Sequence, residues 1–445
     1  MRRALALFLS LAVLASAAVW LVERPGSVAV TWLGYRVESS VPVLAVLLGL
    51  GFLILLSAVE GLRWLAGWPF AFRRLRGETR RRRAIVALTE GLSASAAGEA
   101  ATAGKLAAKA GRLVPNDPLA LLLAAQAAQV ANNFDAARRH FAALAERPET
   151  AFLGARGLYM LADRDGDAAE ALAQARRAQS LRPNSPWSAS ELLRQEIAAG
   201  EWSAAEASLQ RARNLRAIGE AEATRRQAVL LHCAAVASDA RGEESRAIQL
   251  ARRAVALAPD LEPAAALAGR LLAAAGDVKQ ARQLLGQAWV KVPHPELAAA
   301  FLATAQPQPK SRLEAARQLA GFNPGHVESH LLVADAALEA GDLTTARQHL
   351  ERAAGAGQSR RFCQMMAEIK GKGEHDRAAA DAWHIKAADA PPTAVWQCRA
   401  CGWQAAQWAA RCPHCGEFDS ARWQLPLGSE PSPTPPTAAP ATLRR

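Results

Sequence analysis

Residues 262–293 read EPAAALAGRLLAAAGDVKQARQLLGQAWVKVP, and this stretch is one copy of a repeat. A Gly-Asp turn at Gly276 separates two apolar segments, Ala281 follows the turn by five residues, and Pro293 closes the stretch. The same order recurs along the chain. Its turns lie at Gly98, Asn132, Gly166, Gly200, Gly242, Gly276, Gly341 and Gly373, and its alanines at Ala103, Ala137, Ala171, Ala205, Ala247, Ala281, Ala346 and Ala378.

The first four turns are spaced by 34 residues, a period typical of the tetratricopeptide repeat (TPR), a helix–turn–helix unit. Glycine or asparagine accepts the left-handed conformation that ends the first helix, and an acidic residue beside it favours the N-terminus of the second. The alanine allows the two helices to approach closely, and the proline cannot continue the second helix. We therefore predict an all-α solenoid over residues 84–390, with about eight to nine repeats.

Two intervals break this period. The spacing from Gly200 to Gly242 is 42 residues, an excess of eight that we place around residues 213–224. The spacing from Gly276 to Gly341 is 65 residues, close to two repeats, and the segment 306–309 (QPQP) replaces the missing turn. Irregular repeats are where we expect a solenoid to change curvature or bind a partner.

The N-terminal residues 1–65 are predicted to form a transmembrane hairpin. Residues 4–22 and 41–59 are uncharged apolar runs, each long enough to cross a hydrocarbon core of about 30 Å. Arginines flank the outer ends of this pair and not the linker 23–40, which places both termini on the cytoplasmic side of a bacterial inner membrane. The segment 15–17 (ASA) also fits a signal-peptide cleavage site, and cleavage there would leave one span.

A basic juxtamembrane neck follows at residues 66–83. Its cations are Arg73, Arg74, Arg76, Arg80, Arg81, Arg82 and Arg83. They fit contact with anionic lipid headgroups or a docking strip for a membrane-bound partner, and the sequence does not separate the two. Residues 1–83 hold twelve arginines and four glutamates, a net +8 of the chain's +12. Because the basicity belongs to the membrane end, we exclude nucleic acid as a partner.

Four cysteines near the C-terminus are predicted to hold one metal ion. Cys398 and Cys401 form one C-x-x-C-G knuckle, and Cys412 and Cys415 form a second. Two such knuckles supply four thiolates to a tetrahedral ion, with zinc as the default and iron as the alternative. Since about 35 residues bury little core, the ion stabilises the fold of residues 391–425, here termed the knob. Four protein ligands leave no open position, so the site is structural.

The surroundings of the knob carry further expectations. Four tryptophans, Trp396, Trp403, Trp408 and Trp423, are expected to pack the knob against the last repeat. His414 lies inside the second knuckle, where we expect a solvent-facing spacer. Cys412-Pro413 also matches a heme-regulatory dipeptide, but ligation within the knuckle explains it better. Residues 426–445 contain six prolines and are predicted to be a disordered tail.

No catalytic motif is found in the sequence. His326 and His330 lie four residues apart, but the intervening glutamate is in the wrong place for a metalloprotease, so we interpret both as surface or groove residues. The chain has no G-x-G-x-x-G, P-loop or G-x-S-x-G sequence. We expect a protein that is not an enzyme.

The hairpin, the neck and the segment 31–40 (TWLGYRVESS) resemble the N-terminal domain of the proteobacterial HemY family. The resemblance covers roughly residues 1–130, and then less specifically the repeats. It implies an inner-membrane protein associated with late protoheme (porphyrin) biosynthesis. It supplies no site residues.

The C-terminal end resembles a second family, that of lipopolysaccharide assembly protein B. Its plan is a membrane anchor, cytoplasmic TPRs and a terminal rubredoxin-like domain, and Cys398, Cys401, Cys412 and Cys415 match its metal ligands in kind and pairing. This resemblance implies an adaptor for a membrane protease. The two predicted spans depart from its single span.

These observations predict a non-enzymatic membrane scaffold that binds protein partners in the concave TPR groove. A HemY-like role among heme-synthesis enzymes is the first hypothesis. The second is an adaptor that presents a client to a membrane protease. The third is tetrapyrrole or metal handling through the knob.

Overall fold

The computed structural model describes residues 12, 13, 15, 16, 19, 20, 23, 26–32, 34–356, 358–373, 375–391 and 394–425, and it does not describe the side chains of residues 32, 35, 37, 62–77 and 356. The first predicted span, residues 4–22, lies largely outside this part of the chain, and the predicted tail 426–445 lies entirely outside it. The chain divides into two compact units, residues 1–140 and 141–445.

The first unit begins with a β-hairpin where the sequence analysis places only a linker. Strands β1 (Ser27–Trp32) and β2 (Tyr35–Ser40) pair antiparallel, with Val30 opposite Val37. Gly34 supports the tight turn between them with φ +86°. In β1, Val28 and Val30 alternate with the small residues Ser27, Ala29 and Thr31, which is the period expected of a strand.

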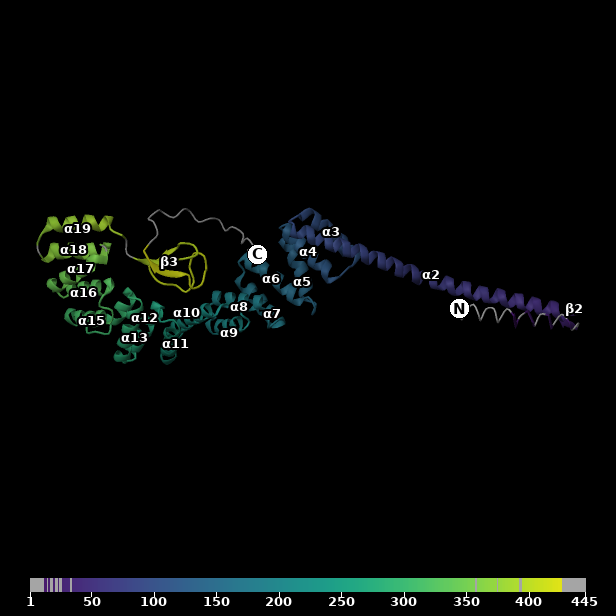
Figure 1. The fold of residues 1–445 in the computed structure, drawn as a ribbon, viewed down its shortest axis with the longest axis horizontal. Helices are drawn as coiled ribbons and strands as arrows, with labels where there is room; N and C mark the ends of the chain where they lie inside the picture. The colour runs from purple at the N-terminus through teal and green to yellow at the C-terminus, as the bar shows by residue number, and fades with distance from the viewer. Residues whose placement is uncertain are drawn as a thin grey trace. The chain divides into compact units, whose positions relative to one another are not determined.

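A single helix, α2 (Val41–Ala96), follows the hairpin (Figure 1). It contains the predicted second span 41–59, the basic neck 66–83 and the first part of the predicted solenoid, which begins at residue 84. Its segment Val41–Gly61 is the one stretch in the described residues that is long and apolar enough to cross a membrane. The large side chains of this segment are exposed, as in Phe52 at 61% and Ile54 at 63%. An apolar surface of this extent requires a membrane or a partner to cover it.

The rest of the first unit packs alanine-rich helices against the end of α2. They are α3 (Ala100–Leu113), α4 (Pro118–Val130) and the start of α5 (Phe134–Ala145). Ala87, Ala103, Ala107 and Leu123 are buried at their contacts. The Arg80 guanidinium donates a hydrogen bond of 2.8 Å to the carbonyl of Arg112, so one neck arginine contacts the first repeat.

The second unit is a series of paired antiparallel helices (Figure 1). In chain order they are α6 (Ala151–Asp165), α7 (Ala168–Leu181), α8 (Pro186–Ala198), α9 (Trp202–Asn214), α10 (Glu220–Ala240), α11 (Glu244–Leu257), α12 (Glu262–Ala274), α13 (Val278–Lys291), α14 (Pro295–Leu302), α15 (Pro309–Phe322), α16 (Val327–Glu339), α17 (Leu343–Ala353), α18 (Arg360–Glu368) and α19 (Arg377–Asp389). Short helices η1 (Ala354–Ala356) and η2 (Ile369–Gly373) flank α18. The all-α prediction for this part is confirmed.

Seven of the eight predicted turns have the conformation that the sequence requires. Their turn residues have positive φ, from 55° at Asn132 to 84° at Gly276. The alanine five residues later is fully buried in each case, with at most 1% exposure at Ala171. Gly269 shows how close the paired helices lie, since a Cβ there would stand 2.6 Å from the Leu285 side chain.

The eighth turn is displaced from its predicted position. Gly373 ends the π-helix η2, and the left-handed residue is His375, with φ 54°. Asp376 then caps α19 by accepting a hydrogen bond from the Ala379 N–H. The buried alanine is consequently Ala380, whereas the predicted Ala378 is exposed. The π-helix η2 lies directly before this turn.

The two irregular intervals appear as one long and one short helix. The eight-residue excess lengthens α10 to 21 residues, against 13 in α8 and in α12, and a left-handed Arg216 makes the preceding turn. The second interval contains α14 with only eight residues, and α15 begins at Pro309. The excess is therefore a helical extension, residues 220–227.

The knob forms a small sheet with strand order β4-β3-β5. Strand β3 (Val395–Cys398) lies between β4 (Gln404–Ala405) and β5 (Ala421–Gln424), antiparallel to both. The first knuckle connects β3 to β4, and the second precedes β5. The sheet therefore brings the two knuckles to one end of the knob.

Candidate metal centre and its docking surface

The four knob cysteines lie together. Their four Sγ atoms are all within 4.8 Å of one another. The Cys398–Cys415 Sγ distance is 3.7 Å and the Cys401–Cys412 Sγ distance is 3.6 Å. A tetrahedron with metal–sulfur bonds of about 2.3 Å has edges of about 3.8 Å, so the cluster has the size of a four-thiolate site.

The two knuckles share one backbone pattern. The Gly402 N–H donates to the Cys398 carbonyl at 2.9 Å, and the Gly416 N–H donates to the Cys412 carbonyl at 2.8 Å. Both glycines adopt positive φ, 75° and 74°, which a side chain would strain. The two halves of the site are therefore built alike, as the repeated C-x-x-C-G sequence suggests.

The surroundings of Cys398 lower the pKa of its thiol and so favour the thiolate that a metal requires. Burial opposes ionisation, but the nearby Ser420 hydroxyl, 3.2 Å from Sγ, and the backbone N–H groups of Ala400 and Cys401 outweigh it. Together they lower the pKa of Cys398 to about 6. Hydrogen bonds to thiolate sulfur of this kind are the usual support of such sites.

The other candidate residues do not join the cluster. His414 is exposed and stacks on Trp403, with ring centroids 5.4 Å apart. His326 caps α16, where its Nδ1 accepts a hydrogen bond from the Glu328 N–H, while His330 lies against His349 with 3.2 Å between the Nδ1 atoms. Among the described residues, the cysteine set is the one group of three or more such side chains able to hold a metal.

The knob packs on the central repeats, so the predicted contact with the last repeat is wrong. Figure 1 shows the knob beside α10 and α12 rather than against α19. Its hydrogen bonds and ring contacts fall on α8, α10 and α14, the first helices of their pairs. Three of the four predicted tryptophans, Trp396, Trp408 and Trp423, dock the knob, whereas Trp403 is 47% exposed and stacks on His414. The sequence carries no signal for the partner helices, because docking is a long-range contact.

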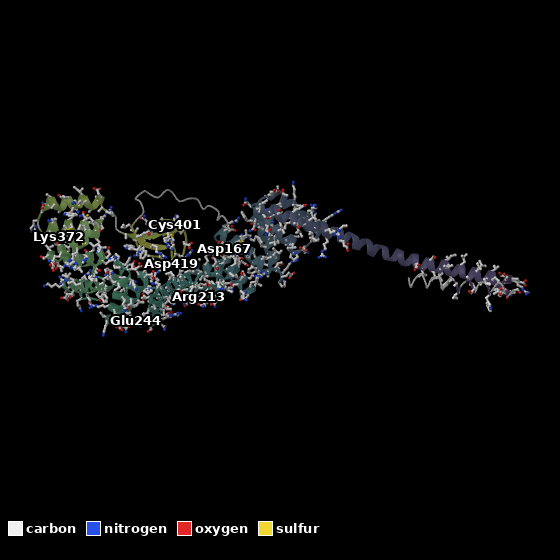
Figure 2. All side chains as sticks on the ribbon, viewed as in Figure 1. Asp167, Arg213, Glu244, Lys372, Cys401 and Asp419 are labelled. Carbon is white, nitrogen blue, oxygen red and sulfur yellow. The ribbon has the colours of Figure 1, made fainter. Side chains whose placement is uncertain are left out.

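An ion pair ties the knob to the extension of α10. The Arg225 Nε donates to Asp419 Oδ2 at 3.0 Å, and Arg225 Nη1 lies 3.0 Å from Asp260 Oδ2. The Asp419 side chain is only 8% exposed. Figure 2 shows Asp419 on the side of the knob nearer the helices, with Cys401 farther away. The eight extra residues of this repeat thus supply a docking residue.

Two buried histidines receive the tryptophans of the knob. His294 caps α14 and contacts both Trp396 and Trp423, with centroid distances of 5.1 and 4.5 Å. His232 of α10 meets Trp408 edge-on at 5.1 Å. Burial lowers the pKa of each histidine to about 4, aided at His232 by Arg270. Both rings are therefore neutral near pH 7, as an apolar interface requires.

Phe418 and Arg411 complete the docking. Phe418 packs on the buried clusters of α8–α9 and of α10–α11. The Arg411 Nη1 donates to the Ala198 carbonyl at the end of α8, at 3.2 Å. Neither residue was singled out from the sequence, although each lies beside or within the second knuckle.

Comparison with known proteins identifies the N-terminal part. Residues 26–132 match the family model described as the HemY protein N-terminus. These residues form a HemY domain. It comprises the β-hairpin, α2, α3 and α4, and it confirms the family resemblance read from the segment 31–40.

In addition to this domain match, a curated relative matches almost the whole chain. It is the probable magnetosome protein Mms48 of Magnetospirillum gryphiswaldense, 28% identical over 439 residues, which cover 96% of this chain and 94% of the relative.

Solved structures with the same kind of helical array include a tetratricopeptide repeat protein from Parabacteroides merdae, at 14% identity, covering 54% of this chain and 93% of that one, with TM-score 0.27. The MamA protein is 16% identical, covering 50% and 95%, with TM-score 0.22. These two likenesses concern the fold alone.

Proposed function

We propose that this protein is a non-enzymatic scaffold, anchored in the bacterial inner membrane, whose TPR solenoid binds protein partners on the cytoplasmic face. The observation that carries the proposal is the continuity of α2. One helix contains the apolar segment Val41–Gly61 and, without interruption, the first helix that packs in the repeat array. A solenoid joined in this way works at the membrane surface, where it has extended faces for partners.

The docked knob supports a structural metal in this scaffold. Four thiolates close the coordination shell, which leaves no position for a substrate, and zinc is preferred to iron as the ion. Cys398, Cys401, Cys412 and Cys415 would hold the ion and so stabilise the folded knob. The folded knob covers part of the repeats. The knob contacts the solenoid through Trp396, Trp408 and Trp423, and these contacts fit a knob with a structural role.

The HemY domain supports an association with late protoheme biosynthesis as the first candidate role. A second candidate is an adaptor for a membrane protease, favoured by the four-cysteine knob at the end of a TPR array. Exposure of Cys401 and Cys415 leaves metal or tetrapyrrole handling as a third.

Crosslinking in intact membranes, followed by mass spectrometry of the captured proteins, tests these roles. Capture of porphyrinogen-handling enzymes or ferrochelatase supports the heme scaffold. Capture of a membrane protease with an envelope-lipid enzyme moves the assignment to the adaptor. Absence of any specific protein partner contradicts the scaffold proposal, and metal that a chelator removes readily favours the third candidate.

A further inference from the structure

The β-hairpin at the start of the first unit has two unlike faces. Cross-strand partners share a face, and the register of β1 with β2 sorts the strand positions into two sets. One set, here termed the valine face, is Val28, Val30, Trp32, Tyr35, Val37 and Ser39. The other set is Ser27, Ala29, Thr31, Arg36, Glu38 and Ser40. The first set is apolar or aromatic except for Ser39, so the hairpin is an amphipathic sheet.

The hairpin alone does not cover its valine face. Val30, inside β1, is 48% exposed. The sheet consists of two strands, so the hairpin supplies no second layer on which this face could pack. An isolated two-stranded hairpin is at best marginally stable in water, and packing of its apolar face is what stabilises it. The valine face therefore requires a covering surface from outside the hairpin.

The place of the hairpin in the chain indicates which surface this is. Strand β2 ends at Ser40, and the apolar segment Val41–Gly61 begins at the next residue. The Val41 N–H donates a hydrogen bond of 2.9 Å to the Gly26 carbonyl, so both ends of the hairpin are held at the first turn of α2. With the apolar segment in a bilayer, the hairpin starts at the layer of lipid headgroups.

The length of the strands favours a hairpin that lies along the bilayer surface. Each strand has six residues, which span about 20 Å at about 3.3 Å per residue. The headgroup layer on each side of the hydrocarbon core is only about 5–8 Å thick. An upright hairpin would place most of the valine face in water, whereas a flat one keeps the face within this layer. Tryptophan and tyrosine, the residue types at positions 32 and 35, are enriched there.

The charges of the hairpin fit a surface that is bound by apolar contact. Arg36 and Glu38 are the only charged residues in the sequence 27–40, and they form an ion pair of 3.1 Å. Their side chains are 67% and 64% exposed, and their positions lie on the face opposite the valines. Because the hairpin has no net charge, attraction to anionic lipids does not hold it. The charged pair also opposes deeper entry into the hydrocarbon core.

We propose that the valine face of the hairpin lies on the bilayer surface beside the span and binds the interfacial region of the lipids by apolar contact. The occupant of this face is lipid, and neither a partner protein nor a second copy of the chain covers it. The inference rests on the membrane anchoring in the proposed function. It adds a second membrane contact, which limits how deeply the first turn of α2 enters the bilayer.

The test uses the full chain, one copy per phosphatidylcholine nanodisc, and a charged maleimide that does not enter lipid. Single cysteines are introduced by Val28→Cys and Val30→Cys on the valine face and by Ala29→Cys and Thr31→Cys on the other. Mass spectrometry of the peptide that contains the new cysteine separates its labelling from that of the native cysteines. We expect the valine-face cysteines to react at least about tenfold more slowly than their neighbours, because burial of an apolar side chain keeps the exposed state rare.

Two neighbouring pairs keep the comparison valid if one substitution disturbs a strand. The ratio of rates should change by less than about twofold when phosphatidylglycerol replaces part of the lipid, since the hairpin is neutral. Equal rates on both faces overturn the inference. So does protection that appears only in native membranes, where a partner protein would be the cover, or only with the anionic lipid, where charge attraction would be the cause.

Leu50→Cys, within the apolar segment, tests the anchoring separately. Slow labelling at this position together with equal rates on the two hairpin faces leaves the anchored scaffold standing and overturns only the lipid contact of the hairpin. Fast labelling at this position contradicts the membrane anchoring itself.

Discussion

The repeats of the solenoid fall into regular and irregular ones, and the irregular ones hold the knob. Helices α6–α9 follow the 34-residue period with buried alanines at Ala171 and Ala205. The lengthened α10 and the shortened α14 interrupt it, and these two helices supply Arg225, His232 and His294 to the docking surface. Departures from the repeat thus mark where the solenoid binds something, here a part of its own chain.

The docked knob restricts where a partner can bind. The knob occupies the faces of α8, α10 and α14, which are first helices of their pairs and line the groove where the sequence analysis places a partner. A partner of the central repeats must therefore use the knob's own surface, the edge of the knob or other repeats.

The largest effect is expected from removing two ligands. Cys398→Ser with Cys401→Ser should abolish metal binding and unfold the knob, because a four-thiolate site contributes on the order of 10 kcal/mol. The solenoid should keep its helices. Metal content by mass spectrometry and far-ultraviolet circular dichroism check both points. His414→Ala is the matched control, and a variant pair that kept its metal would contradict the site.

The next effect is on pH dependence. Burial holds the pKa of His232 and of His294 near 4, below the value of about 6.5 in an unfolded chain. The unfolded state therefore binds more protons between these values, so docking stability is complete above pH 6.5 and falls as the pH drops towards 4. The loss is on the order of 1–3 kcal/mol per histidine.

Tryptophan fluorescence during thermal unfolding, with metal content recorded at each pH, measures this loss. His294→Asn retains a helix-capping side chain and should flatten the dependence. The facing groups, Arg270 and Trp408 at His232 and Glu296 with two tryptophans at His294, stay in place in that variant. An unaltered pH profile would show that His294 is not the titrating group.

A smaller effect is expected from the docking ion pair. Arg225→Ala leaves Asp419 largely buried with only Arg422 as a cation, so docking should weaken by about 2 kcal/mol. Arg226→Ala removes a pair with Glu222 on the same helix and should cost at most about 0.5 kcal/mol. Hydrogen exchange of the amides in β5 distinguishes the two variants. Equal protection in both would mean that Arg225 does not hold the knob.

The sequence predicts what is local and repeated. Gly276 and Ala281 are recognisable because the same conformational need recurs every repeat, and the cysteines because ligand spacing is dictated by the ion. The docking of Asp419 on Arg225 could not be foreseen, since these residues are 194 positions apart and carry no motif. The β-hairpin is not predictable in the same way, because its two six-residue strands lie between apolar runs and have the length and composition of a linker.

The smallest effect tests the displaced last turn, where the predicted register fails by two residues. Ala380 is 8% exposed at the contact of α19, while Ala378 faces solvent. Ala380→Leu should therefore overpack the helix pair and cost about 1–2 kcal/mol, and Ala378→Leu should change stability by less than about 0.5 kcal/mol. Urea unfolding measures both. The expected ranking shows that Ala380 is the alanine that meets the partner helix, whereas the opposite ranking would restore Ala378, five residues after Gly373, to that contact.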